Sequence, residues 1–334
     1  MPLLKLPCND SCLNLCGSCH GILCFVNIFR LVICLCNPVT HECFKLPNSR
    51  TQTSALVRGF HLVELGFGYD PSTKDYKIIT ILEAGDSARY DRVEVDNSIL
   101  VVEVYKLSTK CWSRVEHNGE LEFLHSVKSV GSGVVFNGIL YWWMESRAEP
   151  NDKRVCHAIV TFDFHSERFG RMECLQNLSS KDSILTVIGG GSLAFVRRNS
   201  NMESGDTFDV WVVYDTNHQE EDQESSCWTK KCSVAPSSVG PYLRQLTCWN
   251  HDELLLVNLG PNVVNHVIYD DDEDYIQEQV QELASCRLLQ EDGSSLEEQH
   301  YKAVDIGRDL VKSSIFARAL RFYPSLVPIS ARGN

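Results

Sequence analysis

The sequence predicts an all-β protein built from repeated four-stranded antiparallel sheets, the architecture of a kelch-like β-propeller. Two short patterns recur in the same order along the chain, and nothing between Gly21 and Tyr275 shows a sustained helical stripe. One pattern returns at a regular spacing, because Asp163 and Asp215 lie 52 residues apart and Asp215 and Asp270 lie 55 apart. A period of about 50 residues is that of a propeller blade with four short strands.

The first pattern is a tight turn followed by an apolar strand. A Gly or Asp precedes the apolar part, where a two-residue hairpin needs a positive φ or a local side-chain hydrogen bond. A leucine stands at the same place in each copy: Leu23, Leu140, Leu193 and Leu254. The copies are HGILCFV from His20, NGILYWW from Asn137, GGSLAFV from Gly190 and HDELLLV from His251.

The second pattern is an apolar strand that ends in a polar turn, followed by an aromatic that opens the next strand. Its copies are CNPVTHECF from Cys36, YDPSTKDYKI from Tyr69, YKLSTKCW from Tyr105, FDFHSERF from Phe162, YDDDEDYI from Tyr269 and a stretched copy from Tyr214 to Trp228. Asp and Asn stabilise such turns by accepting hydrogen bonds from nearby backbone N–H groups. We therefore expect equivalent places in different blades for Asp70, Asp163, Asp215 and Asp270.

Together the patterns predict blades at about 21–47, 66–116, 131–175, 184–234 and 243–282, which is five, or six if the first and last fragments count separately. The predicted organisation is a short segment 1–17, a propeller over 18–282, an acidic loop with a possible short helix over 283–320, and a closing strand over 321–330. Aromatics that recur in one slot are expected to fill the blade core: Tyr76, Trp112, Phe169, Trp228 and Tyr275, with Trp142 and Trp143 after the first pattern.

Charge excludes nucleic acid as the main partner. The 334-residue chain has a formal net charge of −13, which repels a phosphate backbone. Eleven carboxylates lie between Asp270 and Glu298 with only Arg287 opposing them, and they form either an acidic docking surface or solvated loops. A membrane is not expected as a partner, because the best apolar stretch, Ile22 to Cys36, is shorter than the roughly 20 residues of a spanning helix.

The 15 cysteines suit a reducing compartment, because the first residues, MPLLKLPCND, lack the features of a signal peptide. We expect mostly free thiols and a cytoplasmic or nuclear location, with no cofactor. Eight cysteines precede residue 44, and a zinc site could be drawn from Cys8, Cys12, Cys16, Cys19 and His20. These residues form one crowded run rather than two spaced pairs, so buried small apolar side chains are the favoured interpretation and no metal is expected.

Several segments resemble the plant F-box-associated domain, a kelch-like propeller family that includes the S-locus F-box proteins. They are SCHGILCF from Ser18, CNPVTHECFKLP from Cys36, GFGYDPSTKDYKIITI from Gly66, VEVYKLSTKCWSRV from Val102 and the terminal YPSLVPI, with His20 where the family usually has Asn and Cys36 where it has Trp. The resemblance implies a non-catalytic module that recognises substrate proteins for a cullin-based SCF ubiquitin ligase. The bound protein is not identified.

The family's members carry an N-terminal F-box that docks on the Skp-type adaptor of the ligase. Here the first expected strand begins within about twenty residues of Met1, which leaves no room for that helical module. We therefore expect this chain to bind the Skp-type adaptor and the cullin only if an F-box is supplied.

Two long loops of mixed charge are the candidate partner-binding segments, because variable loops on a rigid scaffold carry recognition. They are EAGDSARYDRVEVDN, 83–97, and MESRAEPNDKRVCH, 144–157. Residue types that anchor interfaces occur in them: Arg89, Tyr90, Arg92, Glu145 and Arg147. The alternative is that both loops are only solvated.

A propeller hydrolase is the competing function. The motifs of metalloproteases, P-loop enzymes, kinases and α/β-hydrolases are absent, but glycosidases need only two suitably placed carboxylates. The candidates are Asp70, Asp163, Asp215 and Asp270, at the mouth of the channel. Their recurrence at successive turns favours capping of those turns over chemistry performed once.

Overall fold

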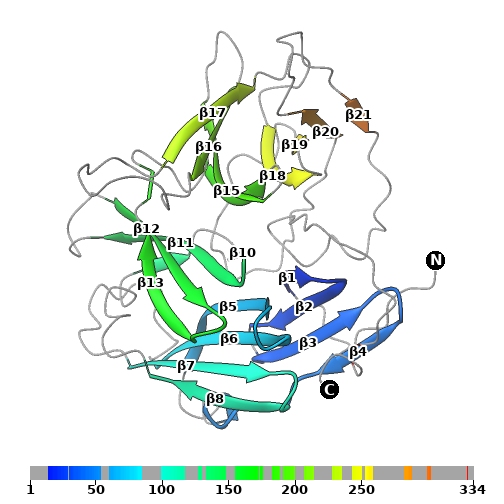
Figure 1. Ribbon diagram of the computed structural model, residues 1–334, viewed down its shortest axis with the longest axis vertical. Coiled ribbons are helices and arrows are strands. Elements are labelled where there is room, and N and C mark those ends of the chain that lie inside the picture. The colour runs from blue at the N-terminus through cyan, green and yellow to red at the C-terminus, as the bar shows by residue number, and fades with distance from the viewer. Residues whose placement is uncertain are drawn as a thin grey trace, which may run out of the picture. The chain divides into compact units, whose positions relative to one another are not determined.

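The computed structural model describes residues 14–28, 30–53, 60–84, 99–116, 127–129, 133–147, 155–172, 174–175, 183–188, 191–199, 207–213, 228–234, 243–249, 253–258, 282–287, 299–301 and 329. The chain divides into two compact units (Figure 1). The first contains residues 1–176 and 322–334, and the second contains residues 177–321. Apart from one helical turn at 50–53, the regular elements in these ranges are β-strands.

Three antiparallel sheets form the first unit, and in each the strands pair in chain order. Sheet 1 contains β1 (Asn14–Cys19), β2 (Ile22–Asn27), β3 (Val32–Asn37) and β4 (Glu42–Lys45). Sheet 2 contains β5 (Phe60–Asp70), β6 (Asp75–Ala84), β7 (Ile99–Lys106) and β8 (Cys111–Val115). Sheet 3 contains β10 (Val134–Phe136), β11 (Ile139–Arg147), β12 (Val155–Asp163) and β13 (Arg168–Met172), and β9 (Val127–Ser129) also pairs with β11.

Two further antiparallel sheets form the second unit, again with strands paired in chain order. Sheet 4 contains β14 (Ser183–Ile188), β15 (Ser192–Asn199), β16 (Thr207–Val213) and β17 (Trp228–Val234). Sheet 5 contains β18 (Leu243–Trp249), β19 (Glu253–Asn258), β20 (Glu282–Arg287) and β21 (Gln299–Tyr301). First strands of neighbouring sheets contact each other, β1 with β5 and β14 with β18, as the inner strands of propeller blades do.

The predicted all-β repeat is confirmed, with four four-stranded sheets and one five-stranded sheet among the described residues. The predicted end of the last blade at residue 282 is wrong, because β20 and β21 continue sheet 5 to Tyr301. The register of β19 with β20 shows where the next strand lies, because Leu254 is opposite Cys286 and Leu256 is opposite Ala284. The strand that follows β19 in the sheet therefore begins only after residues 259–281. The copy of the second pattern at 269–275 falls within that connection and lies outside the described residues.

The start of the propeller also differs from the prediction, because β1 begins at Asn14 rather than at residue 18. The helix expected within 283–320 lies outside the described residues beyond Tyr301. Of the expected closing strand, 321–330, only Ile329 is described. It is buried with the core residues of sheets 1 and 2, and its N–H donates to Glu42 Oε2 at 2.6 Å.

No helix among the described residues is long and apolar enough to cross a bilayer. The apolar stretch from Ile22 to Cys36 instead supplies β2 and β3, which pair with each other.

The first pattern forms tight hairpins, as predicted. His20 and Gly21 both have positive φ, 46° and 78°, between β1 and β2. Asn137 and Gly138 do the same between β10 and β11, at 50° and 76°. Two successive positive φ values are those of a type I′ turn, whose twist matches that of the flanking strands. The first hairpins of sheets 1 and 3 are therefore both type I′ turns.

Sheet 2 is buried on both faces, and this places it between sheets 1 and 3. Alternate residues of β6 point in opposite directions: Tyr76 and Ile78 pack with sheet 1, while Ile79 and Ile81 pack with sheet 3. On the sheet 1 side, the partners include Ile22, Cys24 and Leu35. On the sheet 3 side they include Leu140, Trp142 and Phe162. A strand buried on both faces reads as a near-continuous apolar run, which is what IITI from Ile78 to Ile81 is.

The aromatic slot of the second pattern fills the blade cores, as predicted. Tyr76 and Trp228 are buried, and Trp112 and Phe169 are partly buried and pack against the core. Trp142 and Trp143 are both buried although they are neighbours on β11, so both faces of sheet 3 are covered. Tyr275 lies outside the described residues.

Glycines on β5 allow sheets 2 and 3 to approach closely. A Cβ at Gly66 would lie 1.9 Å from Leu140 Cδ2 and 3.2 Å from Trp142 Cζ2. A Cβ at Gly68 would lie 2.2 Å from Phe164 Cε2. Both positions face sheet 3, while the alternate residues Leu65 and Phe67 pack with sheet 1. At these positions the inner strand therefore has large side chains on the face toward sheet 1 and no side chain on the face toward sheet 3.

We predict that Gly66→Ala lowers the free energy of unfolding by about 1–3 kcal/mol, because an added methyl group overpacks the contact between the two sheets. Chemical denaturation followed by tryptophan fluorescence measures the change. Gly17→Ala is the matched control, because a Cβ there meets its nearest atom at 3.6 Å, an ordinary contact. Equal stability of the two variants would contradict the packing argument.

Candidate functional site

Each sheet of the first unit has two different ends. Hairpins that join first to second and third to fourth strands leave a sheet at one end, and connections between second and third strands leave it at the other. We call these the turn end and the loop end. The turn end has the hairpins 20–21, 37–41, 70–74, 106–110, 137–138 and 163–167, and the loop end has the connections 28–31, 85–98 and 148–154.

The turn ends of sheets 1, 2 and 3 lie side by side. The His20 ring lies 4.8 Å from the Tyr69 ring, and its Nδ1 is 3.0 Å from the Tyr76 hydroxyl. A Cβ at Gly138 would lie 3.1 Å from Pro71 Cδ, which places the first hairpins of sheets 2 and 3 in contact. Because sheets 2 and 3 have the same orientation, their loop ends also lie on a common side.

Side-chain caps fix the turns at this end. Asp70 Oδ1 accepts from the N–H groups of Ser72 (2.9 Å) and Thr73 (3.3 Å). Asp163 Oδ1 accepts in the same way from His165 (2.7 Å) and Ser166 (3.4 Å). Asn37 does so in sheet 1, with the N–H of Val39 at 3.0 Å and that of Thr40 at 3.4 Å. The capping role expected of Asp70 and Asp163 is therefore what their geometry provides.

Asp70 and Asp163 do not occupy equivalent places, contrary to the prediction. Asp70 caps the hairpin between the first and second strands of sheet 2, whereas Asp163 and Asn37 cap the hairpin between the third and fourth strands of their sheets. In all three turns the residue four positions after the capping side chain has a positive φ: His41 at 56°, Lys74 at 55° and Glu167 at 55°. The same turn chemistry can close either hairpin, which is why sequence spacing did not separate them. Asp215 and Asp270 lie outside the described residues.

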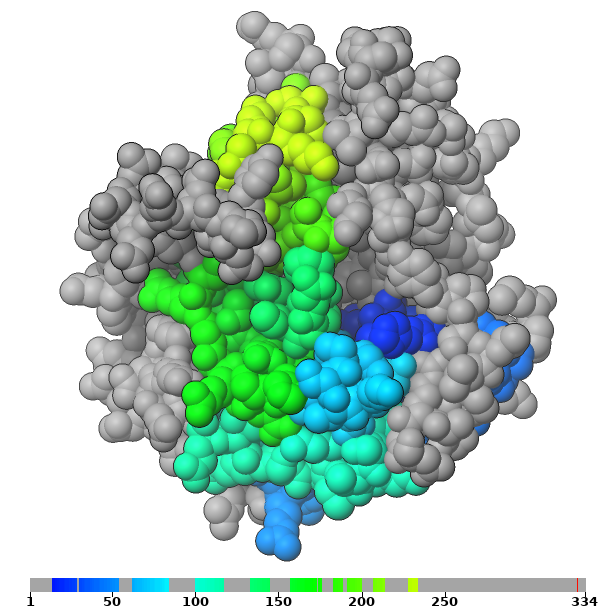
Figure 2. Space-filling view, viewed as in Figure 1, coloured from blue at the N-terminus to red at the C-terminus, as the bar shows by residue number. Residues whose placement is uncertain are grey.

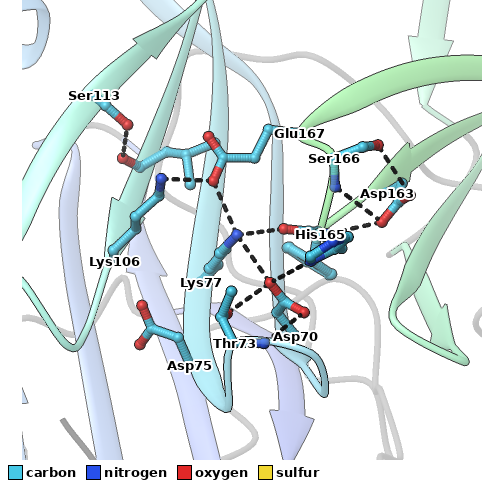
Figure 3. Close-up of polar contacts among 12 residues, drawn as sticks. Asp70, Thr73, Asp75, Lys77, Lys106, Ser113, Asp163, His165, Ser166 and Glu167 are labelled. Atoms are coloured by element: carbon cyan, nitrogen blue, oxygen red, sulfur yellow. Dashed lines mark hydrogen bonds and ion pairs between the residues drawn. The ribbon is translucent and has the colours of Figure 1, made fainter. Parts of the chain in front are cut away.

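A buried lysine ties sheet 2 to sheet 3 (Figure 3). Lys77 Nζ on β6 lies 3.2 Å from Asp70 Oδ2 and 2.9 Å from Glu167 Oε1. It also donates to the carbonyl oxygen of Phe164, in the turn between β12 and β13. The side chain of Lys77 is 4% exposed and that of Asp70 is fully buried. A charge at this depth is tolerated because three oxygen atoms surround the ammonium group.

The cluster balances its own charge. Lys106 Nζ lies 2.8 Å from Glu167 Oε1, so Glu167 joins Lys106 to Lys77. Two lysines therefore face two carboxylates, Asp70 and Glu167. His165 stands at the rim of the cluster, with Nδ1 3.6 Å from Asp70 Oδ2 and a side chain that is 60% exposed. The two lysines and two carboxylates together therefore carry no net charge.

Hydrogen bonds decide the ionisation of these groups. Burial raises the pKa of the Asp70 carboxyl, but hydrogen bonds from Thr73, Lys77 and the backbone outweigh it and hold the pKa at about 2. Burial also raises the pKa of Glu167, but Lys106 and Lys77 lower it below its ordinary value. Burial lowers the pKa of Lys77, and its bonds to Glu167 and Asp70 raise it above the usual range. All three groups are therefore charged near neutral pH.

This chemistry does not suit Asp70 to the role of the proton donor in the hydrolase hypothesis. A glycosidase acid must hold a proton near neutral pH, whereas Asp70 loses its proton at about pH 2. Both Asp163 oxygens are engaged in its own turn, since Oδ2 accepts from the Ser166 hydroxyl at 2.9 Å. These side chains hold turns and sheets in place.

A second buried carboxylate has a similar role in the second unit. Asp209 on β16 lies 2.8 Å from Lys230 Nζ and 3.4 Å from Arg197 Nη2, and it accepts from the Ser233 hydroxyl at 2.7 Å. Burial raises the pKa of Asp209, but hydrogen bonds from Lys230, Ser233 and Asn199 lower it to about 2. Its partners come from neighbouring strands, so the interaction stabilises sheet 4.

The described part of the chain has no group of three His, Cys, Asp or Glu side chains placed to hold a metal ion. Of the five residues in the possible zinc run, Cys8 and Cys12 lie outside the described residues. Cys16 donates from its thiol to the Asn14 carbonyl oxygen at 3.4 Å. His20 packs on Tyr69 and Tyr76.

Most described cysteines are free thiols, as predicted, with one exception. Cys36 and Cys43 form a disulfide between β3 and β4, where the strand register places them directly opposite with a Cα–Cα distance of 4.2 Å. The described cysteines that form no disulfide are Cys16, Cys19, Cys24, Cys34, Cys111, Cys174 and Cys232. Burial and a hydrogen bond with Cys16 raise the pKa of the Cys24 thiol, with the hydrogen bond the larger cause, so this group is held neutral.

The predicted partner-binding residues fall in, or next to, the connections between second and third strands of sheets 2 and 3 in the sequence. Arg89, Tyr90 and Arg92 fall in the connection between β6 and β7 and lie outside the described residues. Glu145 and Arg147 belong to the end of β11, where only the backbone is described. The flanking strand ends, Ala84 with Ile99 and Arg147 with Val155, are paired in register. Two loops far apart in sequence therefore leave adjacent sheets on the same side.

Sequence reasoning did not find Lys77. Its signal was present, because a lysine inside the apolar run YKIITI falls on the face of β6 that also carries Ile79 and Ile81. Alternation predicts that such a side chain enters a core. The partner carboxylates could not be inferred, since Glu167 lies ninety residues away in another sheet.

We predict that Asp163→Ala lowers the free energy of unfolding by about 1 kcal/mol, because two backbone N–H groups lose their acceptor. Asp163→Asn should cost less, since Asn37 caps its turn through the same kind of oxygen. Thermal unfolding of both variants tests this. A stable Asp163→Ala protein that had lost a hydrolytic activity would favour the enzyme hypothesis instead.

We also predict a loss of stability as pH falls from about 4 to about 2. The pKa of Asp70 lies below its ordinary value of 3.8, so its charged form favours the folded state above pH 4, and this advantage disappears as the folded carboxyl takes up a proton. The shift corresponds to about 2 kcal/mol. Asp70→Asn should therefore be less stable than wild type at pH 7 and equal to it below pH 2, as measured by denaturation at each pH. A difference independent of pH would contradict the assignment.

Comparison with known proteins agrees with this architecture. The F-box associated beta propeller domain family matches residues 5–329. Among curated relatives from Arabidopsis thaliana, F-box protein DOR is 26% identical over 191 residues, 57% of this chain and 42% of the relative. F-box protein At2g16450 is 26% identical over 216 residues, which cover 58% of this chain and 45% of the relative. F-box/kelch-repeat protein At3g23880 is 28% identical over 153 residues, which cover 46% of this chain and 36% of the relative.

The chain spans about half the length, or less, of the curated relatives it matches. The family match, in contrast, covers nearly the whole chain and includes all five sheets. The repeated four-stranded sheets, their capped turns and this match agree, and the chain belongs to the F-box-associated β-propeller family.

Proposed function

We propose that this propeller recognises a protein substrate for a cullin-based SCF ubiquitin ligase. The observation that carries the proposal is the family match over residues 5–329, with relatives that are F-box proteins. In such a ligase the propeller binds the substrate while an F-box binds the Skp-type adaptor. Recognition through contacts between proteins needs neither a cofactor nor a catalytic group, and the described carboxylates already hold turns and sheets.

The loop end of sheets 2 and 3 is the part of the first unit that we assign to the substrate. Its two long connections, 85–98 and 148–154, leave sheets whose opposite ends are fixed by capped turns and by Lys77. A rigid scaffold reduces the entropy lost when loops on it bind a partner. Arg89, Tyr90 and Arg92 belong to one connection, while Glu145 and Arg147 stand at the strand end that leads into the other.

In this proposal the propeller binds the substrate, and an F-box attached to it binds the ligase. We propose that this chain acts in the cytoplasm or the nucleus, and that it joins the Skp-type adaptor and the cullin when an F-box is attached to it. Tagged pull-downs from plant extract, with the chain alone and with a family F-box fused at its N-terminus, test the second statement. Both forms should capture the same substrate, and only the fused form should also capture the adaptor and the cullin.

Capture of the adaptor by the unfused chain would contradict this division. Loss of the substrate from the fused form alone would show instead that the fusion blocks the propeller.

We predict that Arg89→Glu with Arg92→Glu weakens substrate capture without unfolding the protein. Reversing two charges at an interface removes favourable contacts and adds repulsion, which together cost about tenfold or more in affinity. The matched control is Lys45→Glu with Arg50→Glu, which makes the same change in net charge at exposed residues of β4 and the helical turn. Thermal unfolding verifies the fold of each variant. Equal capture by both double variants would contradict the role of the loop.

A further inference from the structure

Sheet 1 has a cysteine on each of its four strands. They are Cys16 and Cys19 on β1, Cys24 on β2, Cys34 and Cys36 on β3, and Cys43 on β4. Of these six, Cys36 and Cys43 form a disulfide and the other four form none. Figure 2 shows parts of residues 14–53, in blue, at the surface of the molecule. A local property therefore distinguishes the bonded pair from its neighbours.

Strand register is the property that distinguishes this pair. Cys36 lies directly opposite Cys43, and their Cα atoms are 4.2 Å apart. Cys34, in contrast, lies opposite Phe25 on β2 and Lys45 on β4. In the described strands of sheet 1, no other two cysteines are paired directly across neighbouring strands. The disulfide joins the one pair that the ladder itself brings together.

The same register is compatible with a broken bond. Opposite residues of any antiparallel pair have Cα atoms about 4.5–5.5 Å apart without a covalent link. Cys36 and Cys43 also lie only seven residues apart in sequence. The hairpin between them is capped independently, because Asn37 Oδ1 accepts from the Val39 N–H at 3.0 Å. The two thiols of the reduced form therefore stay close enough to join again.

Access to the bond from solvent is through one of its two sulfur atoms. Cys36 is fully buried, whereas Cys43 is partly exposed on β4, the outer strand of the sheet. Cys34 and Cys24 are both fully buried. A hydrogen bond with Cys16 and burial also raise the pKa of the Cys24 thiol, and a neutral thiol is a poor nucleophile. A small reagent in solution therefore reaches Cys43 before these buried cysteines.

The bond holds a strand that contacts the C-terminal part of the chain. β4 contains only four residues, and in the described sheet it pairs with β3 alone. Glu42, the neighbour of Cys43, accepts from the Ile329 N–H at 2.6 Å. Ile329 is buried with the core residues of sheets 1 and 2. Because short outer strands open locally at low free-energy cost, a covalent link between β3 and β4 also stabilises the contact at Ile329.

We propose that Cys36 and Cys43 form a reversible thiol–disulfide site that exchanges with glutathione and controls how firmly β4 holds the chain at Ile329. The inference rests on the cytoplasmic or nuclear location proposed above, where glutathione keeps most thiols reduced and a disulfide is typically transient or redox-sensing. The site lies in sheet 1, outside the connections assigned to the substrate, so the inference goes beyond the proposed function.

Oxidation of the site by glutathione disulfide takes two exchange steps. The Cys43 thiolate attacks one sulfur of glutathione disulfide, so a bond forms between Cys43 and glutathione and one glutathione thiolate leaves. The Cys36 thiolate then attacks Cys43 Sγ, forms the Cys36–Cys43 bond and releases the second glutathione thiolate. Two protein thiols are oxidised, one glutathione disulfide is reduced, and the two thiol protons pass to the two glutathione thiolates. Reduction by glutathione is the reverse sequence.

A redox titration of the full chain tests the site. The protein is incubated at defined ratios of reduced to oxidised glutathione, quenched with acid, unfolded in urea and alkylated with N-ethylmaleimide. Cleavage after Arg30 and Lys45 leaves Cys34, Cys36 and Cys43 in one peptide. Mass spectrometry should find three labels on this peptide in reducing buffer and one label, on Cys34, in oxidising buffer.

Two results of the titration would overturn the proposal. One is a bond that persists in a large excess of reduced glutathione, which would make it a permanent structural disulfide. The other is a peptide that keeps three labels in a large excess of glutathione disulfide.

Hydrogen exchange at the Ile329 amide tests the consequence of the switch. Exchange should be about tenfold faster in reduced than in oxidised wild type, because the link between β3 and β4 is lost. Cys43→Ser should exchange at the fast rate in both buffers. Cys43 is partly exposed, so this variant should fold, and thermal unfolding verifies it. Cys111→Ser, at an exposed cysteine of β8, is the matched control and should keep the difference between the buffers.

Equal exchange at Ile329 in oxidised and reduced wild type would overturn the control of this contact. A difference between the buffers that survives in Cys43→Ser would overturn it as well, because glutathione would then act at another cysteine. Both wild-type measurements remain decisive if a variant does not fold.

These measurements are separate from the test of the proposed function. Neither the titration nor the exchange measurement involves a substrate or a ligase. A failure of the thiol site therefore leaves the pull-down result unchanged. Unchanged substrate capture by Arg89→Glu with Arg92→Glu would remove the assignment of the loop end and leave the thiol site in place.

Discussion

Burial of sheet 2 on both faces is the constraint on which the rest of the first unit depends. A strand such as β6, with Tyr76 and Ile78 on one face and Ile79 and Ile81 on the other, needs a neighbouring sheet on each side. Sheet 1 covers the first face and sheet 3 the second. Close contact on the side of sheet 3 requires Gly66 and Gly68, because a Cβ at either position would collide with Leu140 or Phe164. Burial of apolar surface on both faces thereby favours the observed arrangement of the three sheets.

Polar groups then set the precise relation of sheets 2 and 3. Lys77 extends from the same face of β6 as Ile79 and meets Asp70, Glu167 and the Phe164 carbonyl oxygen. A buried ion pair adds little net stability compared with an apolar pair, since desolvation offsets its attraction. Its effect is instead directional, because only one placement of the turn 163–167 satisfies the ammonium group. The capped turns and this contact hold the turn end of sheets 2 and 3 in one arrangement.

Rigid and variable parts are thus divided between the two ends of the same strands. Capping side chains hold the hairpins at the turn end, whereas the connections between second and third strands differ greatly in length, from 28–31 in sheet 1 to 85–98 in sheet 2.

The sequence by itself determined the blade repeat, the turn chemistry and the aromatic core, because each depends on residues close together in the chain. Alternation along a strand and an Asp or Asn at a turn are local signals, and they predicted the roles of Asp163 and Trp228. Only the tertiary structure decided contacts over long separations. It paired Lys77 with Glu167, extended sheet 5 past residue 282 to β20 and β21, and placed Asp70 at a different hairpin from Asp163. These outcomes depend on strand register and on the packing of one sheet against the next, which no local pattern encodes.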